Sequence, residues 1–265
     1  MDDHRPDSGK TIKSIEQMLV ILESIRRRGE AGVTEIAGDV GLSKSTVHHY
    51  VKTLELYDCL EKTDGRYRLG LRFLTYGGQA RAGNRIYRLA KADVDRLAQE
   101  TGELVRLVVE QRGYGITLYQ SAGDEASRSD SHVGRVEELH CTAAGKAFLA
   151  ALPESEVADL LEDIELTRYT DQTITERDVL VAELERIRSR DVAFDDEERH
   201  DGTRCVAVSI TNRSDELLGA ISVSGPKERL QGERFRTTIP NELQNLVGVV
   251  EINTTYSDWE EHVPN

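Results

Sequence analysis

Long apolar runs are absent from this sequence of 265 residues. The segment MLVIL, at Met18–Leu22, is far shorter than the roughly 20 apolar residues that a membrane-spanning helix needs. The N-terminal stretch MDDHRPDSGK has no apolar core of the kind found in signal peptides, and we expect residues 1–10 to be disordered. The sequence therefore predicts a cytoplasmic protein with no membrane partner.

Cysteine is also scarce. Cys59, Cys141 and Cys205 are odd in number and none has a paired spacing, which indicates free thiols in a reducing compartment. His140, Cys141, His200 and Cys205 are residue types that bind zinc, but the two pairs lie about sixty residues apart and lack C-x-x-C spacing. We therefore predict no metal ion and no cofactor.

Lysine provides only 8 of the 34 basic residues, and 48 acidic residues give a net charge of −14. Residues 1–75 contain 12 acidic and 12 basic side chains, so the whole acidic excess falls on the rest of the chain. Acid-rich, lysine-poor composition suggests the cytoplasm of a halophile. At molar salt the Debye length is about 3 Å, so close contacts, and not long-range attraction, would have to carry any affinity for a phosphate backbone.

A helix is predicted at residues 43–56, SKSTVHHYVKTLEL. Four apolar side chains recur at i, i+3, i+4 and i+7 and form one stripe: Val47, Tyr50, Val51 and Leu54. Ser43 occupies the N-cap position. The opposite face carries hydrogen-bond donors: Lys44, Ser45, His48, His49 and Lys52. Alone, this pattern is equally typical of an ordinary amphipathic helix with a solvated face.

The neighbouring segments favour DNA binding. A shorter helix is predicted at residues 34–40 and ends at Gly41; two such helices joined by a tight turn form a helix-turn-helix, whose second helix enters the major groove. Downstream, strand-like runs at residues 60–63 and 67–69 flank Asp64-Gly65-Arg66, a strong hairpin signal. The sequence thus predicts a winged helix-turn-helix domain over residues 11–73. The expected DNA contacts are Lys44, Ser45, Thr46, His48, His49 and Lys52, with Arg66 at the wing tip on the phosphate backbone.

Residues 74–257 are predicted to form a linker helix and an α+β domain. The connecting helix, at residues 71–81, is weakened by Gly77 and Gly78, by about 1 kcal/mol each relative to alanine. After it, the sequence predicts helices at residues 86–102, 142–152, 175–190 and 234–256. Strands are predicted among them at residues 104–110, 116–121, 206–211 and 217–224. Because strict βαβ alternation is missing, we expect an antiparallel sheet. Thr175 and Asp178 resemble a capping box for the helix at 175–190.

Two features of this domain indicate a ligand site. The segment HCTAAGK, residues 140–146, begins a helix with small residues, and N–H groups at such an end attract anions. Ser222 and Ser224 lie two apart on a strand, so their hydroxyls face the same side. Tight packing also selects small residues, and the serines could equally bond their own backbone. These residues alone therefore do not establish a ligand site.

An enzyme is one alternative. Cys141 with His140 or His200, together with Asp195, provides the residue types of a nucleophilic site, but no local catalytic signature surrounds the cysteine. A small-molecule enzyme with a regulatory DNA-binding domain therefore stays a second hypothesis. A regulator that senses oxidants through Cys141 or Cys205 is a third.

Together the motifs resemble the IclR family of bacterial and archaeal transcription regulators over about residues 11–256. The resemblance rests on GLSKSTVHHYVKTLE, YDCLEKTDGRYRLG, LHCTAAGKAFLAALPE, TITERDVLVAELERIRSRDVAFDDEERHDGTRCVAVSI and GAISVSGP. It implies a winged helix-turn-helix, a linker helix and a GAF/PAS-like effector-binding domain. It further implies a homodimer or dimer of dimers that binds double-stranded operator DNA and responds to a small organic effector.

Matched motif by motif, the resemblance implies effector contacts at Ala143, Ala144, Asp195, Cys205, Ser222 and Ser224. Residues 126–129 read ASRS, where family members often supply apolar pocket residues, and this departure hints at a polar ligand. Asp195 would repel a bare carboxylate unless it is protonated or paired, so we expect a hydroxylated effector.

Overall fold

The computed structural model describes residues 10–262 except 127–130. The expected disorder of residues 1–9 and the segment 127–129 of the ASRS loop therefore lie outside the described residues. The chain divides into two compact units, one ending at Gly83 and the other beginning at Asn84. Within the described ranges, no helix is long and apolar enough to cross a membrane.

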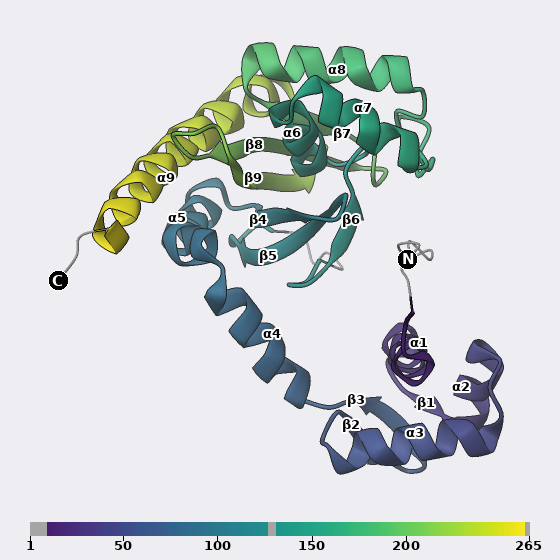
Figure 1. Cartoon of the computed structure of the whole chain (residues 1–265). Coiled ribbons are helices and arrows are strands. Elements are labelled where there is room, and N and C mark those ends of the chain that lie inside the picture. Colours follow the sequence, from purple (N-terminus) through teal and green to yellow (C-terminus); the bar gives the residue numbers. More distant parts are fainter. Residues whose placement is uncertain (1–9, 127–130, 263–265) are drawn as a thin grey trace. The chain divides into compact units, whose positions relative to one another are not determined.

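The first unit combines helices with a small antiparallel sheet of order β1-β3-β2 (Figure 1). Its elements are α1 (Lys13–Arg28), β1 (Ala31–Gly32), α2 (Val33–Val40), α3 (Lys44–Leu56), β2 (Leu60–Thr63), β3 (Arg66–Leu69) and α4 (Arg72–Gly83). The apolar stripe predicted for α3 packs into a core with Ile21 and Ile25 of α1 and Ile36 of α2. The predicted winged helix-turn-helix is confirmed.

The wing is a tight hairpin between β2 and β3. Asp64 and Gly65 have φ values of +48° and +81°, the left-handed conformations that a two-residue hairpin turn requires. Thr63 pairs directly with Arg66. Arg66 is therefore the first residue of β3, whereas the sequence placed it within the turn.

The second unit is built on a six-stranded antiparallel sheet of order β6-β5-β4-β9-β8-β7, which confirms the predicted α+β class. Its strands are β4 (Leu104–Gln111), β5 (Tyr114–Ala122), β6 (Val136–Glu138), β7 (Ala193–Asp196), β8 (Thr203–Thr211) and β9 (Leu217–Pro226). Its helices are α5 (Arg85–Thr101), α6 (Ala143–Ala151), α7 (Glu154–Asp163), α8 (Arg177–Arg190), the π-helix η1 (Arg234–Thr238) and α9 (Ile239–His262).

Two apolar cores cover the two faces of this sheet. On one face, Val105, Ile221 and Val223 pack with side chains of α5 and α9. On the other, Val108 and Ala220 pack with side chains of α6, α7 and α8, as the arrangement of these helices in Figure 1 illustrates. Because neighbouring side chains on a strand face opposite sides, the strand sequences fix which residues meet α6.

Helix α8 begins later than predicted. Its N-cap is Glu176, which makes no side-chain cap hydrogen bond. The Thr175 hydroxyl instead accepts a hydrogen bond from Arg168 Nη2 at 3.1 Å. The predicted capping box of Thr175 and Asp178 is therefore wrong, because the N-cap position falls on Glu176 and not on Thr175.

Candidate DNA-binding face and effector site

Helix α3 is held in place by its first turn and its buried stripe. Gly41, with φ of +68°, ends α2 in the left-handed conformation, and the Ser43 hydroxyl accepts the Thr46 N–H at 3.1 Å. Val47 and Val51 are fully buried. The turn and the core together leave the other side of α3 facing solvent.

That solvent-facing side carries the residues predicted to contact DNA. Lys44, Ser45, His48, His49 and Lys52 are exposed, and Thr46 is half-buried with its hydroxyl 2.8 Å from that of Ser43. Lys52 Nζ lies 2.9 Å from Glu55, and this hydrogen bond raises the pKa of the lysine. Exposed ion pairs are weak, so phosphate can replace Glu55 as the partner of Lys52.

The wing arginines have protein partners. Arg66 Nε lies 2.8 Å from Glu30 and Nη1 lies 3.0 Å from Glu35. Arg68 Nη2 lies 2.6 Å from Glu61. The Arg66 side chain thus ties β3 to the segments on either side of β1, a role that the hairpin motif did not indicate.

The strand residues predicted to contact an effector lie on one face of the large sheet. Asp195 pairs with Cys205, and Cys205 pairs with Ser224, so the three form one row across β7, β8 and β9. Ser222 lies two residues from Ser224 on the same face, as the sequence predicted. All four side chains are buried.

Helix α6 places the remaining two predicted residues over this row. Ala143 and Ala144 are its first two residues and are buried in the core that also contains Cys205. The Thr142 hydroxyl caps the helix by accepting the Gly145 N–H at 3.1 Å. Gly145 cannot be larger, because a Cβ there would lie 2.2 Å from the Leu139 carbonyl oxygen. The structure thus puts four of the six predicted effector residues on one sheet face and the other two in the same core as Cys205.

Arg106 is the residue that sequence reasoning missed. It stands directly opposite Ser222 in the pairing of β4 with β9. Its Nη1 lies 3.1 Å from Glu137 and its Nη2 lies 3.9 Å from the Cys205 sulfur, while only 14% of its side chain is exposed. A charged residue inside the apolar strand LVRLVVEQ was the signal that could have revealed it.

Two buried polar atoms at this place make no well-aligned hydrogen bond to the described residues: Arg106 Nε, and Ser222 Oγ, which approaches the Cys205 thiol. Buried polar groups are nearly always paired, so each unpaired one calls for an explanation. A ligand with an acceptor oxygen over this face of β4 and β9 would satisfy both. Both residues belong to the sheet face that also carries Cys205 and Ser224.

Asp195 adds a titratable group to the site. Burial raises the pKa of its carboxyl to about 7, and the neighbouring Glu198 adds to the rise. Its Oδ1 accepts the backbone N–H of Glu198 at 2.7 Å. Near neutral pH the carboxyl is protonated in part of the molecules, so it repels an anionic ligand less than an ordinary aspartate does.

The buried thiols do not have the properties of nucleophiles. Burial raises the pKa of Cys141, and it raises the pKa of Cys205 to about 11. The thiolate is the reactive form, and a raised pKa keeps the thiol protonated. This chemistry weighs against catalysis or oxidant sensing at either cysteine.

Two depressions in the second unit, of about 540 and 520 Å³, are lined by other residues. One includes Ala150, Ile187 and Gly248, and the other Val109 and Leu217. None of the six predicted effector residues lines either depression.

Comparison with known proteins gives one consistent result. The IclR helix-turn-helix domain model matches residues 14–64, and the model of the bacterial transcriptional regulator IclR C-terminal domain matches residues 79–248. The probable HTH-type transcriptional regulator ArcR of Halobacterium salinarum is 32% identical over 258 residues, which cover 95% of this chain and 98% of that protein. The regulator XynR of Escherichia coli is 33% identical over 216 residues, which cover 80% of this chain and 86% of that one. The crystal structure of the Thermotoga maritima IclR superposes with a TM-score of 0.76 at 28% identity, covering 92% of this chain and 99% of that chain.

Proposed function

Since the chain belongs to the IclR family of transcription regulators, we propose which of its residues read DNA and which sense the effector. The protein is a DNA-binding transcription regulator controlled by a small organic effector in its C-terminal domain. The observation that carries the proposal is the row of exposed hydrogen-bond donors along α3.

On DNA, α3 lies in the major groove with its N-terminal residues on the base edges. The bases and nearby phosphates are contacted by Lys44, Ser45, Thr46, His48 and His49. Lys52, farther along the helix, binds phosphate. Arg66 joins them from the wing once phosphate competes with Glu30 and Glu35 for its guanidinium.

The effector binds at the buried row beneath the start of α6. The sheet side of the site consists of Ser222, Ser224 and Cys205, with Asp195 at the β7 end of the row. The helix side consists of Ala143 and Ala144 at the N-terminus of α6. Effector binding changes DNA affinity only if the effector binds one arrangement of the protein better than another. The two glycines within α4, Gly77 and Gly78, make this helix a suitable place for that change.

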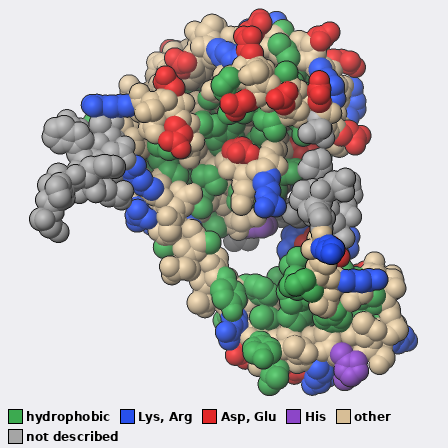
Figure 2. Space-filling model, viewed as in Figure 1, with side chains coloured by type: hydrophobic (Ala, Val, Ile, Leu, Met, Phe, Trp, Pro, Cys, Tyr) green, Lys and Arg blue, Asp and Glu red, His purple; other side chains and the backbone are tan. Residues whose placement is uncertain are grey.

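The working form is a homodimer, or a dimer of dimers, in the cytoplasm. Large apolar side chains are exposed on the first unit: Ile12, Ile15, Leu19, Leu71, Leu74 and Tyr76. Figure 2 shows hydrophobic side chains gathered on this unit and acidic ones on the second. An exposed apolar patch of this kind marks an interaction site, and a second copy of the chain on a palindromic operator is the natural occupant.

The test is binding of the purified full-length protein to the DNA upstream of its own gene, at high potassium chloride. Saturable, sequence-selective binding by an oligomer supports the proposal. A folded oligomer that binds no DNA would contradict it. Turnover of a small molecule by the same protein would favour an enzyme, and oxidant-dependent DNA binding lost on Cys141→Ser or Cys205→Ser would favour a redox sensor.

A further inference from the structure

Three arginine side chains lie around the Glu137 carboxylate in the second unit. Arg106 lies on β4, Arg135 precedes β6, and Arg199 lies in the turn between β7 and β8. Arg106 Nη1 lies 3.1 Å from one oxygen of Glu137, and Arg135 Nε lies 3.1 Å from the other. Burial alone would raise the pKa of this carboxyl, but the three guanidinium groups hold it below its usual value. One carboxylate therefore faces three cations.

Arg106 has one edge that no carboxylate occupies. A guanidinium group binds a carboxylate through two parallel N–H groups, and on one edge of the group these belong to Nε and Nη2. In Arg106, Nε is buried without a hydrogen-bond partner among the described residues. Its Nη2 reaches the Cys205 sulfur at 3.9 Å, and sulfur is a weak acceptor. These two atoms form the open edge of Arg106.

The same edge binds carboxylates elsewhere in this chain. In three places Nε and Nη2 donate to the two oxygens of one carboxylate at 2.5–2.8 Å, in the pairs Arg26–Glu23, Arg28–Asp39 and Arg229–Glu103. These three arginine side chains are 31–49% exposed, whereas that of Arg106 is 14% exposed. Arg106 is thus the most buried of the four, and buried polar groups rarely stay unpaired.

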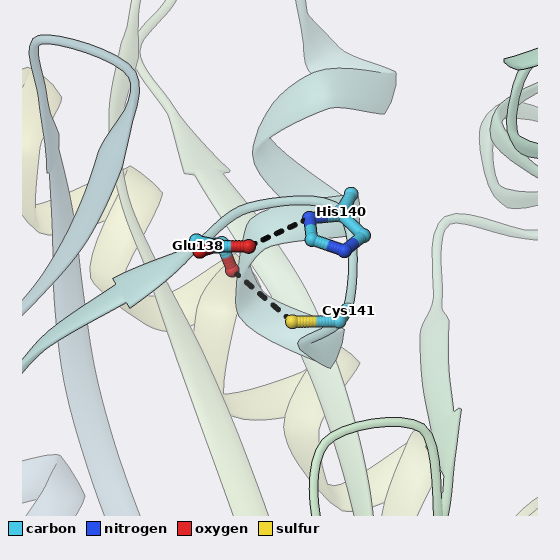
Figure 3. Close-up of side chains that lie close together, drawn as sticks. All are labelled: Glu138, His140 and Cys141. Carbon is cyan, nitrogen blue, oxygen red and sulfur yellow. Dashed lines mark hydrogen bonds and ion pairs between the residues drawn. The ribbon is translucent and has the colours of Figure 1, made fainter. Parts of the chain in front are cut away.

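The nearby carboxylate of Glu138 does not fill the open edge. Figure 3 shows it turned toward His140 and Cys141, and its Oε2 lies 3.4 Å from His140 Nδ1. Its Oε1 accepts a hydrogen bond from the Tyr169 hydroxyl at 2.8 Å. Among the described residues, no arginine forms an ion pair with Glu138. The arginines are therefore not paired from this side.

Arg199 adds a second guanidinium group that needs a partner. Its Nε is buried without a hydrogen bond, and no carboxylate of the described residues forms an ion pair with it. Its guanidinium lies 3.7 Å above the centre of the Tyr169 ring. Asp195 acts on Arg106 from β7, but burial raises the pKa of Asp195 to about 7, so this carboxyl is only partly ionised near neutral pH. Positive charge is thus in excess, and a buried charge is stable only when it is paired.

We propose that the open edge of Arg106 binds the carboxylate of the effector, and that Arg199 supplies the second positive charge beside it. Arg106 then selects a carboxylic acid over uncharged molecules of the same shape. This inference rests on the proposed function, because it assigns one contact within the proposed effector site. A guanidinium fork matches the two oxygens of a carboxylate, and Ser222, directly opposite Arg106 on β9, has a hydroxyl for the same group.

The position of the open edge also limits the size of the effector. The edge lies beside Cys205, and Cys205 pairs with Asp195 on the next strand. Neighbouring strands lie about 4.8 Å apart, so a hydroxy acid of about two to four carbons reaches from the open edge to the Asp195 carboxyl. The carboxylate then lies at Arg106 and a hydroxyl lies at Asp195. The effector class is a short hydroxy acid.

The test is calorimetric titration of the full-length protein with glycolate, glycerate and threonate, each paired with its primary amide. The amide keeps the shape and the hydroxyls but carries no charge. In the wild type at least one acid should bind about 10- to 100-fold more tightly than its amide. Arg106→Gln should bind that acid and its amide alike. A purely structural role of Arg106 would instead lower both affinities by the same factor and leave their ratio unchanged.

Arg135→Gln is the matched control. It removes the same charge beside the same Glu137, but Arg135 Nε already binds Glu137, so the preference for the acid should persist. In Arg106→Gln the Glu137 carboxylate keeps Arg135 as its partner, and thermal unfolding without ligand checks that each variant is folded.

Two results would overturn the proposal: a wild type that binds no acid better than its amide, and an Arg106→Gln variant that keeps the preference. Chloride that competes at Arg106 as strongly as the acids would overturn the assignment of a carboxylate. DNA binding by the same protein is measured separately without ligand. If it is selective while the acids fail, only the effector contact is wrong; if it is absent, the proposed function itself fails.

Discussion

Arg106 and Ser222 stand opposite each other on β4 and β9, each with a buried polar atom that makes no well-aligned hydrogen bond to the described residues. Replacing Arg106 by Met should remove the response to the effector while DNA binding persists. The loss of a charge-assisted hydrogen bond costs about 1.5–3 kcal/mol, roughly a 10- to 100-fold loss of effector affinity. The effector affinity of each variant is measured by thermal shifts with a panel of small hydroxy acids and sugars. Arg112→Met, on the exposed turn after β4, is the control and should respond like the wild type.

The buried ion pair of Lys146 and Glu198 should make a large contribution to folding. Only 1% of the lysine and 9% of the glutamate side chain is exposed. Lys146→Met leaves a buried carboxylate without its cation, which should lower the free energy of unfolding by about 3–5 kcal/mol. The double variant Lys146→Met/Glu198→Leu should recover much of that loss. Urea denaturation measures the free energy of unfolding of both variants. A Lys146→Met variant as stable as the wild type would disprove the contribution of the ion pair.

Gly145 and Gly248 form a matched pair of helix glycines. A Cβ at Gly145 would lie 2.2 Å from a backbone oxygen, whereas one at Gly248 meets nothing within 4 Å. Gly145→Ala should therefore destabilise the protein by about 1–3 kcal/mol through overpacking. Gly248→Ala should stabilise it by up to about 1 kcal/mol through helix propensity. Similar melting temperatures for the two variants would contradict the close contact at α6.

Asp195 should make stability depend on pH. Its pKa is raised from 3.8 to about 7 in the folded protein, so the folded state holds the proton more tightly than the unfolded state. The stabilisation is complete below about pH 4 and is lost as pH rises toward 7. Asp195→Asn keeps an acceptor oxygen for the Glu198 N–H and removes the titration. Melting temperatures at pH 5 and 7.5 should differ less in this variant than in wild type, while Asp201→Asn, in an exposed turn, should behave like wild type.

Two residues of α3 should affect DNA binding in different ways. Lys52→Met should weaken binding to all sequences alike and reduce the slope of log affinity against log salt by about one. His48→Ala should instead change the preference among operator sequences. Lys91→Met, on α5 of the second unit, is the control. Fluorescence anisotropy with operator variants measures each effect, and normal binding by both α3 variants would refute the docking of α3 in the groove.

Local patterns account for what the sequence predicted well. The apolar stripe of α3, its Ser43 cap and the Asp64-Gly65 turn depend on residues within one or two turns of the chain. Alternation along β9 likewise places Ser222 and Ser224 on one face without knowledge of their neighbours. Strands β6 and β7 escaped prediction because their sequences, VEE and AFDD, are too short for a period. They form by pairing with β5 and β8 at the edges of the sheet.

The sequence by itself determined the fold class, the helix-turn-helix and most of the longer helices and strands, because side-chain period and turn chemistry are local properties. Only the tertiary structure decided the partners of the charged residues. Arg66 reaches Glu30 and Glu35, Arg106 reaches Glu137, and Lys146 reaches a glutamate 52 residues away. Which charges meet depends on strand order and helix packing, and these follow from burying the whole apolar surface at once.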